Sequence, residues 1–245
     1  MGLTAPSAVE LRFVVEEPSD RWRLEEEDVP ETPQHAAIIQ LLRLILEHWV
    51  EASGRSALVT SNLACRWDPS DARVGTDPDV VLVEPRPPGG EALRSLRVWE
   101  PGHAPPRIAV EVVSHTDPRK DYAEAPLRCA RLGARELWVF DPGLHGPDDT
   151  GGPFPVQIWR LEETAGRLRT ARTYAGSGPG FSEELGAWLV VTDEGTRLRI
   201  ADDADGRALW PTAFETERAE LERERAERER LADELRSLGH DPDAV

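Results

Sequence analysis

The chain has 245 residues, 39% of them hydrophobic and 31% charged, which suits one substantial folded domain with an appendage. Its 46 acidic and 29 basic residues give a formal net charge of −17, which argues against a broad positive surface for nucleic acid. No apolar stretch approaches the ~20 residues that span a bilayer, and Met1 to Phe13 lack the basic and apolar regions of a secretory signal. We therefore expect a cytoplasmic protein.

A change of composition near residue 200 divides the chain. Residues 201–245 hold 14 acidic and 7 basic side chains, many of them in Glu and Arg repeats. We predict one domain over residues 10–200 and a charged helix over residues 212–239. Residues 1–200 are also acidic, with 32 acidic and 22 basic side chains.

The first strong pattern is a run of apolar side chains at helical spacing over residues 36–50, which predicts an amphipathic helix. Thr32 and Pro33 fit an N-cap followed by proline at the first helical position. Ser56–Cys65 and Val80–Val83 are predicted strands, separated by a polar loop.

The next predicted strand is Arg107–Val113. After it, Asp117 and Pro118 open a loop into a helix that ends near Gly133, because glycine is the usual residue just past a helix C-terminus. Leu137–Phe140 is a further short apolar strand.

Val156–Trp159 and Arg169–Tyr174 are predicted to pair as an antiparallel hairpin at the edge of the sheet. Strand, helix, strand and hairpin in this order predict an α/β fold with a mixed central sheet flanked by helices. Cys65 and Cys129 lack the spacing of metal ligands and are expected to be small core or surface thiols.

In the charged helix, Phe214, Leu221 and Leu235 fall on one seam at heptad spacing. Leu231 and Leu238 lie on a second seam. Three charged residues interrupt the two seams: Glu217, Glu224 and Arg228. A solvated single helix and a homodimeric coiled coil both remain open.

Two acids stand in apolar strands, where acids are rare. Asp79 precedes the valine-rich run 80–83, and Glu111 lies inside the run 108–113. An ionised carboxylate buried in such a strand costs several kcal/mol or more unless it is paired or binds a cation. The sequence therefore favours a metal site, with pairing of Glu111 to Arg107 or Arg131 as the alternative.

The order of motifs resembles the Uma-type restriction endonuclease family, a branch of the PD-(D/E)XK nuclease superfamily. The residues that carry the likeness are Thr32 to His35, Pro78 to Val83, Arg107 to Ser114, Asp121, Leu127, Ala130 to Gly133, Glu136 to Val139, Asp141 with Pro142, and the Glu/Arg helix up to Gly239. The likeness covers most of the chain and implies a restriction-endonuclease-like core.

By that resemblance Asp79, Glu111 and the Val112 carbonyl would bind Mg²⁺ or Mn²⁺ through oxygen atoms. The metal would activate a water molecule and neutralise charge on a phosphodiester. DNA is the partner that the resemblance implies, although the acidic composition argues against tight non-specific binding.

The sequence departs from the family at the position of the family's helix lysine, which is Ala125 here, followed by Pro126. Three interpretations stay open. Lys120, the only lysine, could take over the catalytic role; Arg128 could stabilise phosphate charge but could not act as a base; or the site is degenerate. Pro126 is tolerated if it falls in the first helical turn.

His35 and His115 are secondary candidates. His35 could reach the site from the first helix, and His115 follows the Glu111 strand, but both positions also suit ordinary surface residues. The function expected from the sequence is metal-dependent endonuclease hydrolysis of DNA phosphodiester bonds, with Asp79, Glu111 and Lys120 as catalytic residues. The alternative is a catalytically inactive nuclease-fold protein that binds nucleic acid or a protein partner.

Overall fold

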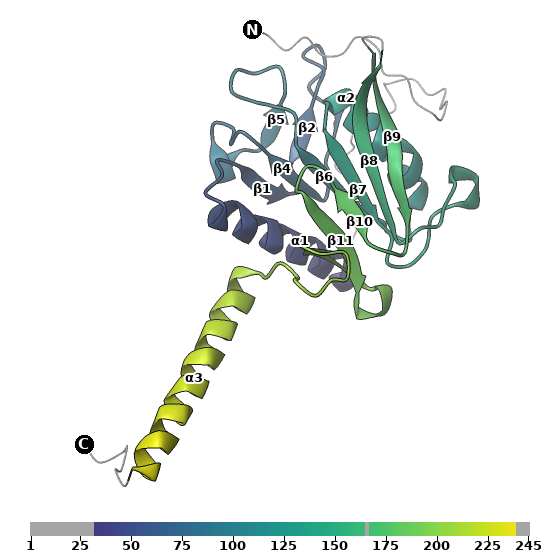
Figure 1. The fold of residues 1–245 in the computed structure, drawn as a ribbon. Coiled ribbons are helices and arrows are strands. Elements are labelled where there is room, and N and C mark those ends of the chain that lie inside the picture. Colours follow the sequence, from purple (N-terminus) through teal and green to yellow (C-terminus); the bar gives the residue numbers. More distant parts are fainter. Residues whose placement is uncertain (1–31, 165–166, 239–245) are drawn as a thin grey trace. The chain divides into compact units, whose positions relative to one another are not determined.

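A six-stranded mixed sheet forms the centre of the computed structural model, which describes residues 32–164 and 167–238 (Figure 1). In spatial order its strands are β1 (Leu58–Ser61), β4 (Val80–Val83), β6 (Ile108–Val112), β7 (Glu136–Phe140), β8 (Val156–Thr164) and β9 (Arg167–Gly176). Among the described strands of this central sheet, only β6 and β7 pair in parallel. The predicted mixed sheet and its edge hairpin are confirmed.

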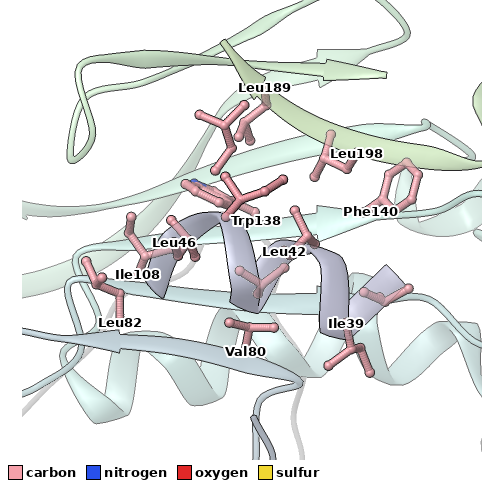
Figure 2. Close-up of a cluster of buried hydrophobic side chains, with 14 of the residues drawn as sticks. Ile39, Leu42, Leu46, Val80, Leu82, Ile108, Trp138, Phe140, Leu189 and Leu198 are labelled. Carbon is pink, nitrogen blue, oxygen red and sulfur yellow. The ribbon is translucent and has the colours of Figure 1, made fainter. Parts of the chain in front are cut away.

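Helix α1 (Pro33–Ala52) covers one face of this sheet. Thr32 caps it, with Oγ1 accepting from the His35 amide, and Pro33 is at its start, as predicted. The apolar face of α1 packs on Val80, Leu82 and other side chains of the sheet, together with Leu189 and Leu198 (Figure 2). This cluster is the larger part of the core.

The second face of the sheet carries α2 (Ala125–Leu132), which lies in the connection between the parallel strands β6 and β7. A parallel pair requires such a crossover. Val81, Val83 and Ala109 point to this face and pack on α2, because successive strand residues alternate between faces. Cys65 and Cys129 are buried free thiols in the same cluster.

Two small sheets complete the larger unit. One consists of β10 (Gly180–Ser182), β11 (Ala187–Thr192) and β12 (Arg197–Ala201), and the other of β3 (Gly75–Thr76), β2 (Ala64–Arg66) and β5 (Ser95–Arg97). β10 to β12 were not predicted from the sequence. Short 3-10 turns cover Gly90–Ala92, Asp148–Thr150 and Asp193–Gly195.

Two predicted elements need correction. The single strand expected over residues 56–65 is split into β1 and β2, because Asn62 adopts a left-handed conformation with φ of 53°. The helix expected after Pro118 is not a regular α-helix: it passes through a π-helical turn, Lys120–Glu124, before it continues as α2. Pro126 falls in the first turn of α2, where the missing N–H is tolerated.

The described residues divide into two units between Trp210 and Pro211. The second unit contains α3 (Ala213–Ser237), which starts with a reciprocal cap between Thr212 and Glu215. No residue of α3 is buried, and its large apolar side chains are exposed. The first part of the predicted domain, residues 10–31, and the predicted helix end at Gly239 lie outside the described residues. None of the helices within the described ranges is long and apolar enough to cross a membrane.

Candidate active site

The strand register brings the two predicted acids together. β4 and β6 are antiparallel and their last pair is Val80 with Val110, so one further step places Asp79 opposite Glu111. Side chains alternate along a strand, and Val81 and Ala109 point toward α2. Asp79 and Glu111 therefore point to the same face of the sheet. Both are buried, with 8% and 2% of their surface exposed.

A cavity of about 820 Å³ opens beside these strand ends. Its walls come from the start of α1, the loop after β6, the π-helical turn and the loop after β7. The lining residues with polar side chains are Thr32, Gln34, His35, Asp79, Ser114, His115, Thr116, Asp117, Lys120, Asp121 and His145. The cavity thus gathers carboxylates, three histidines and the only lysine of the chain.

Asp79 and His35 hold the end of β6 through its main chain. Asp79 Oδ2 accepts from the Val112 amide at 2.6 Å, and His35 Nε2 lies 2.7 Å from the Val112 carbonyl oxygen. His35 Nε2 is also 3.8 Å from Asp79 Oδ2. His35, a secondary candidate from sequence, is therefore a site residue by position.

Glu111 is more deeply buried than Asp79. Its Oε2 has no hydrogen-bond partner among the described residues, and the closest cation is Lys120 Nζ at 3.9 Å. Burial raises the pKa of Glu111 well above its ordinary value; Lys120 opposes this shift, while Asp79 and Asp121 add to it. A buried carboxylate without a full set of partners is a position that a bound cation would stabilise.

Lys120 stands between two acids. Its Nζ is 3.3 Å from Asp121 Oδ1 as well as 3.9 Å from Glu111 Oε2. The negative charge of Glu111 raises the pKa of Lys120, against the effect of burial, so the side chain is a fixed positive charge. Asp121 is 1% exposed, and burial raises its pKa to about 7, with Lys120 acting in the opposite direction.

Asp121 and His145 are site residues to which the sequence analysis gave no role. His145 is positioned by Asp141 at the end of β7, whose Oδ1 accepts from the His145 amide. Asp141 Oδ2 accepts from the Tyr122 hydroxyl and the Gly146 amide. The rings of His145 and His115 meet edge to face, with 6.3 Å between their centroids. Asp121 was among the residues that carry the family resemblance and it directly follows the only lysine, but neither signal assigned it a role.

Position 125 does not take part in the cavity. Ala125 is 2% exposed and packs in the apolar cluster on the α2 face, and it is not among the residues that line the cavity. Arg128, the other alternative, pairs with Glu124 Oε2 at 2.5 Å. Of the two cationic candidates from sequence, Lys120 and Arg128, Lys120 is the one that lines the cavity.

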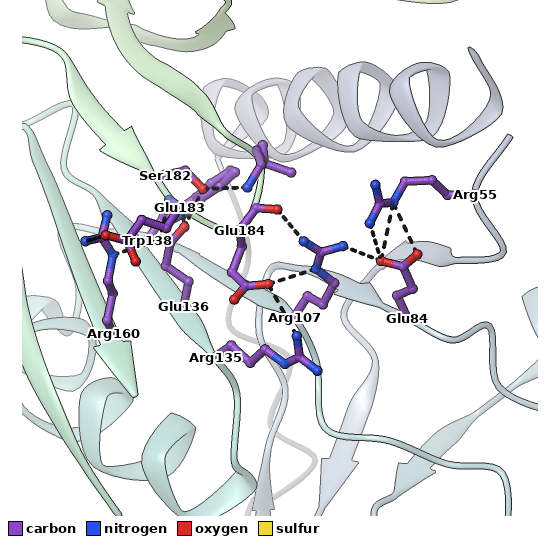
Figure 3. A network of polar contacts seen from close by, with 11 residues as sticks. Arg55, Glu84, Arg107, Arg135, Glu136, Trp138, Arg160, Ser182, Glu183 and Glu184 are labelled. Carbon is purple, nitrogen blue, oxygen red and sulfur yellow. Dashed lines mark hydrogen bonds and ion pairs between the residues drawn. The ribbon is translucent and has the colours of Figure 1, made fainter. Parts of the chain in front are cut away.

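The arginine pairing considered for Glu111 is wrong. Arg107 lies at the other end of the β4–β6 pair, where it contacts Glu84 and Glu184 (Figure 3), and Arg131 is exposed. A neighbouring network in the same view joins buried Glu136 to Trp138, Ser182 and Arg160. These contacts tie the β10–β11 turn to the central sheet and leave Glu111 outside both networks.

The donor atoms suit a hard divalent cation such as Mg²⁺ or Mn²⁺, because they are carboxylate and carbonyl oxygens. Within residues 32–164 and 167–238 no group of three or more His, Cys, Asp or Glu side chains is arranged to hold a metal ion. A cation here would therefore depend on Asp79, Glu111, the Val112 carbonyl and water molecules. The bare Glu111 Oε2 is the observation that fits such a cation.

The α/β fold with its mixed central sheet and the acids at the ends of β4 and β6 define a restriction-endonuclease-like protein. Residues 16–151 match the Uma2 family, described as putative restriction endonuclease, and this match spans more than half of the chain. The chain therefore belongs to the Uma2 family.

No curated protein matches the chain. Among solved structures, the chain is similar to the crystal structure of a putative nuclease belonging to DUF820 from Anabaena variabilis. The two are 17% identical with a TM-score of 0.43, and the match covers 62% of this chain and 73% of the other.

Proposed function

We propose that this protein is a metal-dependent endonuclease that hydrolyses DNA phosphodiester bonds. The observation that carries the proposal is the buried acid pair Asp79 and Glu111, which lies on neighbouring strands and on one face of the sheet. The Oε2 atom of Glu111 has no hydrogen-bond partner among the described residues. Membership of a restriction endonuclease family supports the choice of nucleic acid as substrate.

Asp79, Glu111 and the Val112 carbonyl would hold Mg²⁺ or Mn²⁺. When bound, the cation supplies a Lewis acid for the phosphate and lowers the pKa of a bound water molecule. Asp79 keeps its second role as acceptor for the Val112 amide, so the ligand carboxylate is oriented by the main chain of the neighbouring strand.

Lys120 would be the catalytic lysine in place of position 125. Glu111 and Asp121 hold its ammonium group beside the cavity in the protonated form. In that form it contributes positive charge next to a bound phosphate, where charge develops during hydrolysis. It does not act as a base, because its neighbours raise its pKa.

The second candidate function is an inactive nuclease-fold protein that binds nucleic acid or a protein partner. It is favoured first by the family's lysine position, which is occupied by Ala125 in the apolar core. The formal charge of −17 points in the same direction, since it weakens attraction to duplex DNA.

Nicking of supercoiled plasmid tests the choice. The wild-type protein is incubated with Mg²⁺, Mn²⁺ or EDTA, beside Asp79→Ala and Glu111→Ala. Cleavage that needs the metal and is lost in both variants supports the endonuclease. If wild type and both variants leave the plasmid equally intact while each still binds it, the inactive binding protein is the better account.

We further propose that α3 mediates homodimerisation. Phe214, Leu221 and Leu235 lie on one heptad seam that Arg228 interrupts, and they are 72%, 48% and 41% exposed, so a second copy could bury them. Light scattering over a range of concentrations should show a dimer, and Leu221→Glu combined with Leu235→Glu should give a monomer. A wild-type mass that stays monomeric at every concentration contradicts this proposal.

A further inference from the structure

The hydrogen-bond ladder between β4 and β6 ends at a proline. Asp79 directs its carbonyl toward β1, where it accepts from the Asn62 amide at 3.3 Å. Successive residues of a strand direct their main-chain groups to alternate sides, so Val80 and Pro78 face β6. Two steps beyond the Val80 and Val110 pair, the register brings Pro78 opposite Val112.

Proline has no N–H, so this ladder position offers the Val112 carbonyl no main-chain donor from β4. The Val112 amide, in turn, donates to the Asp79 side chain at 2.6 Å. The Val112 amide and carbonyl, which would continue the ladder, therefore both form hydrogen bonds with side chains. The second of these side chains is His35, with Nε2 at 2.7 Å from the Val112 oxygen.

The direction of the His35 bond follows from its partner. A carbonyl oxygen only accepts, so Nε2 carries the hydrogen. Nδ1 is buried and bonds no other group in the part of the chain that the structure describes, so no second hydrogen bond competes for the ring. The backbone of His35 is fixed as well, because its amide donates to the capping Thr32 at the start of α1.

We propose that His35 is a positioning residue, which replaces the donor that Pro78 cannot supply and fixes the Val112 carbonyl beside Asp79. The consequence for a cation rests on the proposed function: with one lone pair of the carbonyl bonded to His35, the carbonyl is held in one orientation for a metal ion. Residues that orient ligands in this way commonly affect metal affinity 10–100-fold.

Two amide variants distinguish the effect of losing the His35 hydrogen bond from the effect of losing the bulk of the ring. In His35→Gln the side-chain NH₂ can reach the position of Nε2, whereas in His35→Asn it lies near the position of Nδ1. His35→Ala removes both. Gln40→Ala, an exposed position on the same helix, is the matched control.

The first readout is amide hydrogen exchange of the segment 111–117 in the full chain with EDTA. Exchange should be faster in His35→Ala and His35→Asn and close to wild type in His35→Gln and Gln40→Ala. Unchanged exchange in His35→Ala, or equal behaviour of the Gln and Asn variants, would overturn the positioning role.

The second readout is Mn²⁺ affinity, followed by the electron paramagnetic resonance of free Mn²⁺. We expect about tenfold weaker binding in His35→Ala and His35→Asn, with His35→Gln near wild type. Equal affinities in all variants would overturn the effect on the cation. Absence of Mn²⁺ binding by wild type would instead remove the metal from the proposed function, and hydrogen exchange would still decide the role of His35.

Discussion

Asp79, Glu111 and Asp121 are buried acids in one site, and their burial opposes folding when no cation is bound. Glu111 and Asp121 both have raised pKa values, mainly because burial disfavours their charged forms. Lys120 is a single positive charge against these acids. The arrangement is more easily explained by binding of a cation than by stability of the fold.

Asp121 gives a pH-dependent prediction in EDTA. Its pKa rises from 3.8 to about 7 on folding, so between these pH values the folded chain holds a proton that the unfolded chain has released. Stability contributed by this group therefore falls as pH rises. Asp121→Asn should increase the free energy of unfolding at pH 7 by up to about 4 kcal/mol and change it little near pH 4.

Urea unfolding of wild type and Asp121→Asn at both pH values measures this difference, with the exposed Asp148→Asn as control. A loss of stability that is the same at pH 4 and pH 7 would show that Asp121 contributes through its contacts and not through its burial as a charge.

Lys120→Met tests the catalytic role proposed for Lys120. It keeps the length of the side chain and removes its charge, so plasmid nicking should fall by about 10²–10³-fold, as when one charge-stabilising donor is lost. Mn²⁺ binding should persist, because the substitution removes a competing cation. The neighbouring exposed Arg119→Met is the control, and nicking by Lys120→Met at the control rate would refute the role.

Sequence reasoning reached the acid pair because acids inside valine-rich strands are costly and because the family motif marks them. It could not identify His145 as a site residue, because the position of His145 depends on how Asp141 and Tyr122 hold the loop after β7. Nor could it assign Asp121, since its burial depends on the π-helical turn. Arg107 was wrongly considered for Glu111, because it lies at the opposite strand end.

At the scale of elements, the strands of the central sheet were predicted well because their apolar runs are buried on both faces. The break at Asn62 was missed, since a single left-handed residue leaves the apolar pattern intact. β10 to β12 were also missed. In β11 only Ala187 and Leu189 are buried and the other four residues are partly exposed, so the strand has no continuous buried run.

The π-helical turn decides which side chain enters the cavity. It places Lys120 at the cavity and carries Ala125 into the core against the sheet. Ala125→Lys should therefore not restore a catalytic lysine, and should lower the free energy of unfolding by about 2–4 kcal/mol, because it places an ammonium group among apolar side chains.

Thermal unfolding and plasmid nicking of Ala125→Lys check this prediction together. Ala123→Lys, at a half-buried position in the π-helical turn, is a comparison for the effect of added charge. A stable Ala125→Lys protein that nicks faster than wild type would mean that position 125 can direct a side chain to the cavity.

At the scale of the whole molecule, the chain is acidic while the site proposed for it depends on a cation. The formal charge of −17 disfavours long-range attraction to DNA. Affinity for substrate would then depend on the local positive charge of Lys120 and of a bound cation. High salt should therefore weaken nicking by this protein less than it weakens DNA binding by highly basic proteins.

The most direct test of the acid pair as a metal site is the melting temperature of wild type and Glu111→Gln, each in EDTA and in Mn²⁺. Glu111→Gln removes a buried acid of similar shape, so the variant should melt at or above wild type in EDTA. Wild type alone should gain stability with Mn²⁺, because binding to the folded state shifts the unfolding equilibrium. A variant that melts below wild type in EDTA and gains as much from Mn²⁺ would contradict the account.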